Sequence, residues 1–344
     1  MRTSQKFVSA LMGAVASLAL SGPSRAADQA LIDAARKEGS VTWYTALIIN
    51  QFAVPVAEAF QKKYGVKVDY VRANAAESIL RISNEGKAGR MQADIFDSFG
   101  AGQLEREGLL ESYVPDTAKR LPKEFIDPKG FWVATNLYVL TPGYNTSIVS
   151  KGTEPKSFAD LLDPKWKGKM AWGSNGSPSS AAGFVGLVLA DMGEQKGMEY
   201  LKKLAGQNIA PIPLAARQVL DQVIAGEYSV ALQIFNNHAV ISAGQGAPSA
   251  WVPMNPALGV LSVFSLTKSG PHKNAGKLLL DFVVSEDGQK IFREADYMPV
   301  DPAIPPKEPS LRPDGTNFKA IFFTPEEVEQ KLPGWNKTWK DIFG

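Results

Sequence analysis

The feature that most constrains the fold is a regular alternation of helix and strand patterns. Amphipathic helix patterns over residues 28–39, 54–65 and 75–87 alternate with apolar strand patterns over residues 41–46, 66–72 and 93–99. Gly39 and Gly65 stand where the first two helices should end, a position that glycine favours. Because parallel strands need a long crossover, usually a helix, this order predicts an α/β protein with a largely parallel sheet.

The first 26 residues are organised as a secretory signal peptide. Arg2 and Lys6 precede the apolar run "FVSALMGAVASLAL", and Ser24 and Ala26 occupy the small-residue positions of a cleavage site. The run is shorter than the about 20 residues that a membrane-spanning helix needs. No cysteine follows it that could carry a lipid anchor. We therefore expect cleavage after Ala26 and a periplasmic protein.

Removal of this segment changes the charge balance of the chain. Residues 1–26 contain three basic residues and no acid, so the net charge falls from +2 to −1. A chain with this balance has no general basic character, and we expect no nucleic-acid partner. The remaining 318 residues exceed what one hydrophobic core usually organises, which predicts two lobes.

Cysteine and histidine usage excludes several classes of function. The chain has no cysteine and two histidines, His238 and His272. Disulfides, thiolate metal sites, thiol nucleophiles and histidine-rich metal sites are therefore excluded. The sequence also lacks the G-x-S-x-G elbow, the Walker A motif and the H-E-x-x-H motif. We expect neither an enzyme nor a cofactor.

The polar stretch "GSNGSPSSAAGF", residues 173–184, is a candidate anion site. It follows a predicted strand and places Ser177 as helix N-cap with Pro178 at the first helical position. The free N–H groups of residues 179–181, with the hydroxyls of Ser179 and Ser180, would then form an anion cradle. The alternative is that Ser177 only caps its own helix.

Arg217 is a second candidate, because it falls in the first turn of a predicted helix. A cation at that position opposes the helix dipole, so its placement needs a reason. One reason is an ion pair with Asp221, four residues later. The other is that the guanidinium leaves the helix to hold a carboxylate or phosphate. The sequence leaves both open.

Several stretches together resemble one family. They include "VTWYTAL", "EGKAGRMQADIFDSF", "SFADLLDPKWKGKMAW", "VIAGEYSVALQ" and "AGKLLLDFVVSEDGQKIF". In this order they are similar to the ferric-ion-binding type of periplasmic solute-binding protein of ABC transporters. The resemblance implies a two-lobed type II periplasmic binding fold with hinge strands and a ligand between the lobes. It also implies an inner-membrane ABC permease as partner, and we expect a monomer.

The resemblance also suggests lobe limits and site residues. Lobe 1 would comprise residues 27–136 and 259–302, and lobe 2 residues 137–258 and 303–344, with crossovers at residues 131–140 and from residue 258. Ligands in this architecture lie at strand carboxyl ends and helix N-termini. The residues expected at the ligand are Tyr44, Thr45, Ala46, Ser98, Phe99, Ser177, Ser179, Ser180, Arg217, Asn236 and Asn237.

The metal ligands of the ferric-binding relatives are missing. Their two adjacent tyrosines match Asn236 and Asn237, their histidine matches about Ile48, and their acid matches Phe99. Bare Fe³⁺ demands anionic oxygen, and a neutral amide is a poor substitute. We therefore predict no metal site, and a small organic anion as ligand: a carboxylate, a phosphonate or a phosphate ester.

Two alternatives stay open at this point. Iron could be carried within a chelate whose own oxygens hold the metal. An enzyme on the same fold is the alternative from another class, but the catalysts that resemble this architecture, thiaminases, use a cysteine nucleophile, which this chain lacks.

Overall fold

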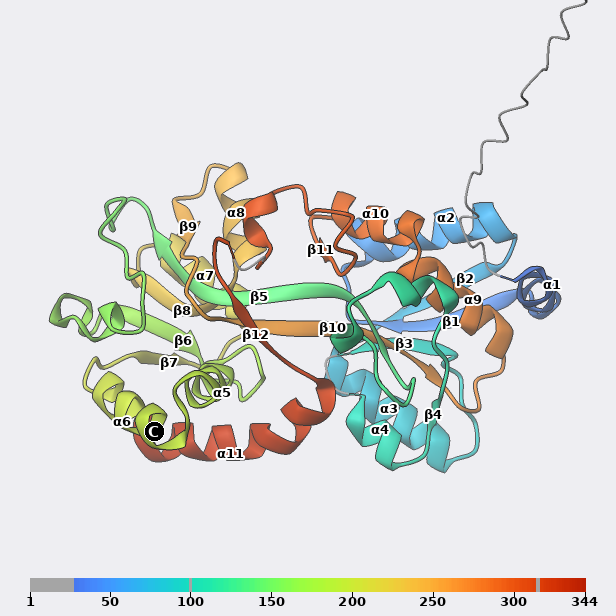
Figure 1. Cartoon of the computed structure of the whole chain (residues 1–344), viewed down its shortest axis with the longest axis horizontal. Helices are drawn as coiled ribbons and strands as arrows, with labels where there is room; N and C mark the ends of the chain where they lie inside the picture. The colour runs from blue at the N-terminus through green and yellow to red at the C-terminus, as the bar shows by residue number, and fades with distance from the viewer. Residues whose placement is uncertain (1–27, 99–100, 314–315) are drawn as a thin grey trace, which may run out of the picture.

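The computed structural model describes residues 28–98, 101–313 and 316–344 (Figure 1). The signal peptide and Phe99 therefore lie outside the described residues. None of the helices within these ranges combines the length and the apolar character needed to cross a membrane.

The first half of the chain confirms the predicted alternation of strands and helices. Gly39 and Gly65 end the first two helices in the left-handed conformation, as predicted. The elements of this lobe are α1 (Gln29–Glu38), β1 (Ser40–Thr45), α2 (Val54–Tyr64), β2 (Lys67–Arg72), α3 (Ala75–Lys87), β3 (Ile95–Ser98), α4 (Gly102–Arg106), β4 (Leu110–Glu111), α9 (Lys273–Val284), α10 (Glu286–Glu294) and β11 (Met298–Pro299).

The second lobe repeats this architecture. Helices cover its strands, and the C-terminal helix packs Trp335 into its core. Its elements are β6 (Met170–Gly173), α5 (Ala181–Met192), α6 (Glu194–Ala205), β7 (Ala210–Ile212), α7 (Ala216–Ile224), β8 (Val230–Phe235), α8 (Asn236–Gly244), β9 (Ser249–Trp251), β12 (Ala320–Phe323) and α11 (Pro325–Phe343). Short helical turns span Ile49–Ala53, Asp116–Arg120, Lys123–Phe125, Asp160–Leu162, Pro164–Trp166 and Pro309–Leu311.

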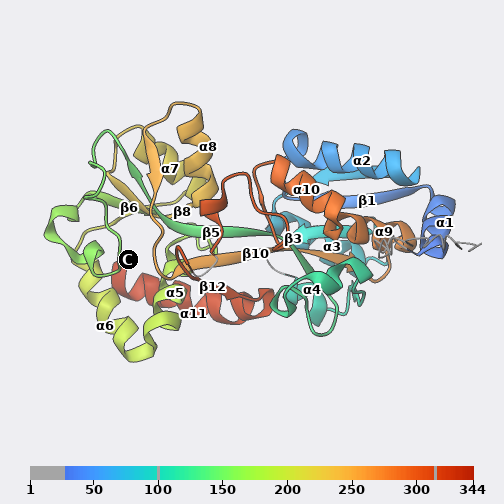
Figure 2. The ribbon, with the colours of Figure 1, turned by 45° about the horizontal axis from the view of Figure 1, so that its top comes forward.

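Two long strands, β5 (Val133–Asn145) and β10 (Ala257–Thr267), run between the lobes (Figures 1 and 2). They pair antiparallel, from Leu258 opposite Leu140 to Phe264 opposite Val133. Val139 and Val263 belong to the core of the first lobe, whereas Leu140 and Val260 belong to the core of the second. The two strands therefore lie where crossovers were expected. The lobe limits given above stay a prediction.

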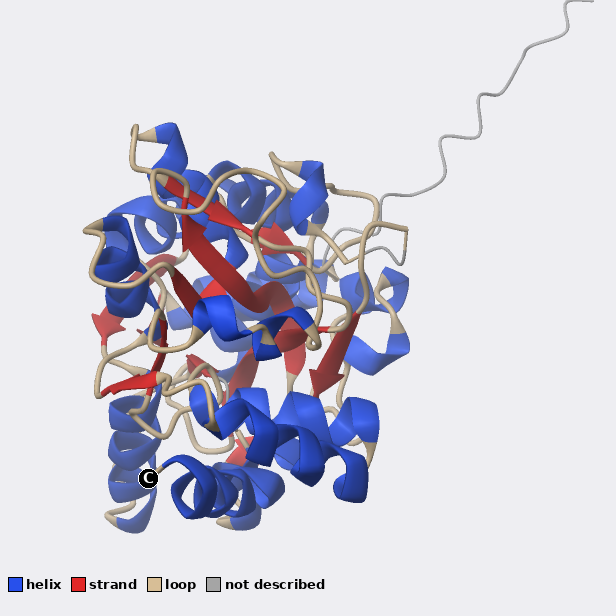
Figure 3. Cartoon of the chain, turned by 90° about the vertical axis from the view of Figure 1, so that its left-hand side faces the viewer, coloured by secondary structure: helices blue, strands red, loops and turns tan. Residues whose placement is uncertain are grey.

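The sheet is mixed rather than largely parallel. Its order is β2-β1-β3-β10-β5-β8-β6-β7. The outer strands pair parallel, β1 with β2 and β3 and β6 with β7 and β8, whereas β10 and β5 pair antiparallel with each other and with β3 and β8. The prediction was right for the helix-connected strands and wrong for the two crossing strands. Figure 3 shows helices on both sides of this sheet.

The start of α5 differs from the sequence prediction. Ser180 is the N-cap residue and Ala181 the first helical residue, so Ser177 is not the cap and Pro178 is not in the first turn. The chain needs these extra residues to turn back from β6. The close approach of the Pro178 carbonyl to the first turn of α5 requires the absence of a side chain at Gly183, because a Cβ there would overlap that carbonyl.

Candidate ligand-binding cleft

A cleft of about 790 Å³ lies between the two lobes. The first lobe contributes the beginning of α3, the end of β3 and part of α4. The second lobe contributes the loop before α5, the residue before α7, the end of β8 and one side of α11. Carboxyl ends of strands and N-termini of helices thus face one another across it, which is the usual arrangement of ligand sites in open α/β folds.

The loop before α5 forms one wall of the cleft. Gly176 adopts φ +77°, which turns the chain sharply, and the Asn336 amide donates to its carbonyl at 2.9 Å. Asn175 Oδ1 accepts from the Ser177 hydroxyl at 2.8 Å, and the Ser177 and Ser179 hydroxyl oxygens lie 3.0 Å apart. These hydrogen bonds hold Asn175, Ser177 and Ser179 at the cleft surface.

The N-terminus of α5 follows this wall in the chain, and Ala181 and Ala182 in its first turn are buried. The N–H groups of Ser179, Ala181 and Ala182 have no hydrogen-bond acceptor within the described part of the chain. The Ser180 hydroxyl does not cap them, because it donates to the Ser177 carbonyl at 2.7 Å. Unpaired N–H groups at the positive end of a helix dipole favour an anion.

The other walls of the cleft are mostly apolar. Of its eighteen described lining residues, eleven are apolar, six are neutral polar residues and one, Glu329, is charged. Ile79 and Leu80 come from α3, Phe235 from β8, and Val328 and Leu332 from α11. Leu80 is 61% exposed, which is unusual for a leucine and reflects its position in the cleft. Such a surface suits the carbon skeleton of an organic ligand.

The three expected residues at the end of β1 are occupied by contacts within the first lobe. The Tyr44 hydroxyl donates to Glu85 at 2.7 Å, and the Thr45 hydroxyl accepts from the Leu47 N–H at 3.0 Å. The Ala46 N–H donates to Asp97 at 2.9 Å. Of the residues expected in this lobe, Ser98 lies in the cleft lining.

Asp97 explains the arrangement at the end of β1. Its carboxylate is fully buried and also accepts from the Trp43 indole N–H at 2.9 Å. Burial raises the pKa of this carboxyl to about 6, even though the hydrogen bonds from Thr45, Ala46 and Trp43 act in the opposite direction. Trp43 and Ala46 are therefore tied to a buried structural acid.

Arg217 forms an ion pair with Asp221, which was one of the two explanations for its position in the sequence. It lies in the first turn of α7, its Nη2 is 2.8 Å from Asp221, and its Nη1 donates to the Ser242 hydroxyl at 2.9 Å. Ala215, just before α7, lines the cleft, whereas the described cleft lining does not include Arg217. The role of Arg217 in ligand binding stays a prediction.

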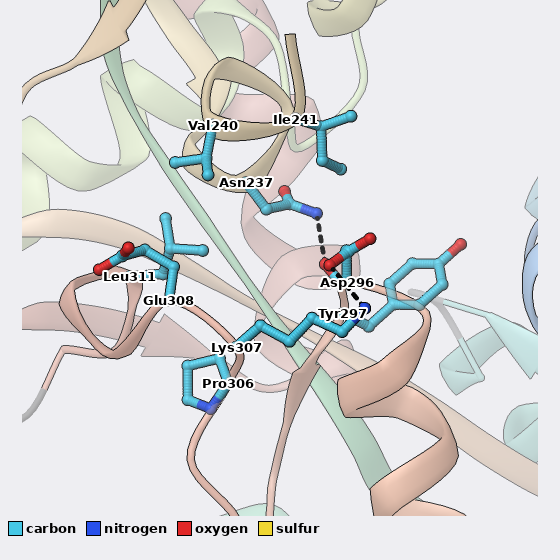
Figure 4. Close-up of a pocket in the computed structure, with 9 residues that line it drawn as sticks. All are labelled: Asn237, Val240, Ile241, Asp296, Tyr297, Pro306, Lys307, Glu308 and Leu311. Atoms are coloured by element: carbon cyan, nitrogen blue, oxygen red, sulfur yellow. Dashed lines mark hydrogen bonds and ion pairs between the residues drawn. The ribbon is translucent and has the colours of Figure 1, made fainter. Parts of the chain in front are cut away.

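Asn236 and Asn237 open α8 and bond to other parts of the chain. Asn236 Nδ2 donates to the Leu311 carbonyl at 3.0 Å, and Asn237 Nδ2 donates to the Asp296 carbonyl at 3.2 Å. Asn237 also lines a separate pocket of about 140 Å³ (Figure 4). In that pocket the residues of α8 face Asp296 and Lys307, which form an ion pair at 3.2 Å.

The sequence matches a family model over residues 92–321, that of the bacterial extracellular solute-binding proteins. The chain belongs to this family. Its fold agrees with that assignment, because the cleft lies between two α/β lobes joined by β5 and β10.

Relatives of this solute-binding protein are named for different ligands. A putative 2-aminoethylphosphonate-binding periplasmic protein of Salmonella typhimurium is 26% identical over 317 residues, covering 87% of this chain and 84% of the relative. Iron-bound HitA from Pseudomonas aeruginosa has a TM-score of 0.72 at 23% identity, covering 88% and 99% of the two chains. AfuA from Actinobacillus pleuropneumoniae with fructose-6-phosphate bound has a TM-score of 0.71 at 23% identity, covering 89% and 98%.

The metal-ligating groups of the solute-binding protein are dispersed. Among the described residues, no three His, Asp or Glu side chains are placed to hold a metal ion together. Burial, with a smaller contribution from the nearby Arg217, lowers the pKa of His238 to about 4, so its imidazole is neutral at pH 7. Phe235 lies beside this ring, 5.1 Å between ring centroids.

The cleft brings together Ser98, Ser177 and Ser179 of the predicted site residues and adds others that the sequence did not single out. Asn74 is the N-cap of α3 in a capping box with Glu77, a pattern that the sequence contains directly after β2. That pattern could have placed Asn74 at a strand end. Glu329 carries no such signal, because its position depends on how α11 packs across the lobes.

Proposed function

We propose that this solute-binding protein is the periplasmic component of an ABC importer and captures a small organic anion in the interlobe cleft. The candidate ligands are carboxylates, phosphonates and phosphate esters. The observation that supports this proposal most strongly is the serine loop before α5. Ser177 and Ser179 line the cleft there, and the N–H groups of Ser179, Ala181 and Ala182 have no acceptor among the described residues. An oxyanion placed there would accept from N–H and O–H donors together.

The apolar walls support an organic ligand over an inorganic anion. Ile79, Leu80 and Phe235 offer carbon surface opposite the serine loop, and burial of apolar area contributes about 25 cal/mol per Å². The aminophosphonate for which the Salmonella relative is named and the sugar phosphate bound to AfuA belong to the proposed class.

Carriage of ferric iron is the second candidate function, and the fold shared with iron-bound HitA favours it. The amides of Asn236 and Asn237 are directed to main-chain carbonyls and are poor ligands for bare Fe³⁺. In this alternative the iron would enter within a chelate whose anionic oxygens meet the N-terminus of α5.

The proposal includes closure of the two lobes on the ligand by bending of β5 and β10, and delivery to an inner-membrane permease by a monomer. It also treats the protein as a binder and not as an enzyme. Arg217 stays a candidate second anion contact to be tested, but the proposal does not depend on it, because its guanidinium is bonded to Asp221 and Ser242.

A ligand panel tests the proposal. Thermal shift followed by calorimetry would compare 2-aminoethylphosphonate, fructose 6-phosphate, citrate, ferric citrate and ferric chloride. A ligand that binds the folded state raises the melting temperature according to RT ln(1 + [L]/Kd). We expect a shift with at least one phosphonate, phosphate ester or carboxylate. A shift with ferric chloride together with a visible charge-transfer band, and none with the organic anions, would contradict it.

A further inference from the structure

An ion pair connects the two lobes at the edge of the cleft. Arg106, at the end of α4, bonds through Nη2 to Glu329 Oε1, in the second turn of α11. Leu104 of α4 packs in the core of the first lobe, whereas Val328 and Leu332 of α11 pack against the core of the second. The pair therefore joins helices that belong to different hydrophobic cores.

A second contact reinforces the first. The Trp132 indole N–H, in the core of the first lobe, donates to Glu326 at 2.6 Å. Glu326 and Glu329 are three residues apart and so lie on one face of α11. Figure 1 shows the N-terminal end of α11 reaching from its own lobe to α4. Both acids of this face thus bond to the opposite lobe.

The sequence leaves room for this contact at Gly102. A Cβ at position 102 would overlap Glu329 Oε2, so the carboxylate lies directly against the backbone of α4. Thr324 and Glu327 form the capping box of α11 and hold its first turn in place. The Glu329 carboxylate therefore lies against the α4 backbone, and the capping box determines where α11 begins.

We propose that Arg106 and Glu329, supported by Trp132 and Glu326, form a latch that holds the lobes closed over the cleft. Glu329, Val328 and Leu332 line the cleft, so movement of α11 away from α4 would open the cleft directly. The latch stabilises the closed state with or without ligand, and it thereby sets the rate of ligand release. Arg106 and Glu329 act as positioning residues in this scheme. The effect on ligand release rests on the proposed function, whereas the effect on closure does not.

The expected size of the effect follows from the exposure of the pair. The Arg106 side chain is 64% exposed and that of Glu329 25%, so the pair is screened by solvent and contributes modestly. Its loss should shift the balance between closed and open states by about fivefold. Because Arg106 is outside the described cleft lining, any effect of Arg106 on ligand release acts through Glu329 and lobe closure.

The test uses Arg106→Gln, Glu329→Gln and the double variant, with Lys337→Gln as the matched control. Lys337 pairs with Asp341 on α11 itself, within one lobe, so its loss should leave closure unchanged. The chain has no cysteine, so single cysteines at exposed Lys62 and Lys202 can carry a fluorescent pair across the lobes. Stopped-flow release of 2-aminoethylphosphonate and of fructose 6-phosphate gives the second measurement.

The latch predicts that both single variants change the interlobe distance distribution of ligand-free protein equally, and that the double variant changes it no further. Ligand release should accelerate about fivefold in each variant, and association should not slow, because more of the ligand-free protein is open. Arg106→Lys keeps the positive charge and should behave nearly like the parent protein. An effect of Glu329→Gln without one of Arg106→Gln would overturn the latch and make Glu329 a direct ligand contact. Unchanged distances in both variants would also overturn it. If neither 2-aminoethylphosphonate nor fructose 6-phosphate binds, the proposed ligand class is contradicted. The interlobe distance measurement still tests the latch in that case.

Discussion

Two polar clusters in the second lobe look alike in sequence and differ in the structure. Ser177–Ser180 precedes α5 and Asn236–Asn237 opens α8, and each follows a buried strand of the same sheet. In the first cluster the hydroxyls bond within the loop, and N–H groups in the first turn of α5 have no acceptor in the described part of the chain. In the second, the amides bond to the carbonyls of Leu311 and Asp296.

The difference lies in what the side chains of each cluster contact. The segment that contains Asp296 and Leu311 accepts the side-chain amide donors of α8, whereas Ser177 and Ser179, just before α5, line the cleft. A polar residue at a helix N-terminus is therefore available to a ligand only where no other segment has bonded to it. This predicts a binding role for the first cluster and a stabilising role for the second.

The largest expected effect is on ligand affinity, in Ser179→Asp. A carboxylate beside the unpaired N–H groups would occupy them and repel an anion, since like charges brought together cost several kcal/mol. We expect the affinity for the tightest organic anion of the panel to fall about 100-fold. Calorimetry measures it, with Ser150→Asp, in an exposed loop, as control. Equal affinities of Ser179→Asp and Ser150→Asp would contradict binding of the anion beside α5.

Asn236→Ala should act mainly on stability. The substitution leaves the buried Leu311 carbonyl without its donor, which costs about 2 kcal/mol of unfolding free energy. Urea denaturation measures the change, and Asn50→Ala at an exposed position should stay within about 0.5 kcal/mol. A 100-fold loss of ligand affinity without loss of stability would show that the amide contacts the ligand instead.

His238, next to the two amides, predicts a pH dependence of stability. Its folded pKa of about 4 lies below the usual 6.5, so the unfolded chain binds more protons and the stability falls as the pH drops from 6.5 toward 4. The contribution is about 1.5 kcal/mol between pH 6.5 and pH 5.

Asp97 opposes this effect, because its raised folded pKa makes the folded state bind more protons than the unfolded chain between about pH 4 and 6. The free energy of unfolding of the His238→Asn variant should therefore rise less between pH 5 and pH 6.5 than that of the parent protein. Denaturation at pH 5 and 6.5 measures both slopes. Parallel slopes would contradict a neutral, buried His238.

The smallest effect is expected for Arg217→Ala. Its guanidinium is engaged by Asp221 and Ser242, so we expect the affinity for the same anion to change less than about threefold. Titration of that anion into the variant measures the change. A loss of tenfold or more would support the role that its position in the first turn of α7 suggested.

The parts of the fold that the sequence predicted are those with local causes. The periodicity of residues 75–87 predicts α3 directly, and Gly39 and Gly65 end α1 and α2 where the sequence placed their ends. Ser177 and Ser179 could be predicted at the ligand site because a run of polar residues between a strand and a helix is visible in the local sequence. The true cap at Ser180 was missed, because the turn back from β6 consumes residues that the cap pattern alone would put in the helix.

The contacts across the lobes were beyond the sequence. Glu329 faces Arg106 across 223 positions of the chain, and Asn236 meets Leu311 across 75. Such pairs depend on how two cores pack against each other, which no periodicity or motif encodes. Within the first lobe, the bond from Tyr44 to Glu85 on α3 depends in the same way on how α3 packs beside β1, which no local pattern gives.

Amide chemical shifts on addition of the tightest organic anion test binding at the N-terminus of α5 most directly. Hydrogen bonds to an oxyanion should move the backbone N–H resonances of Ser179, Ala181 and Ala182 further than those of any other residues, while the side-chain amides of Asn236 and Asn237 stay in place. If the side-chain resonances of Asn236 and Asn237 move while those of α5 stay in place, binding at α5 is contradicted. The ligand would then bind at the start of α8.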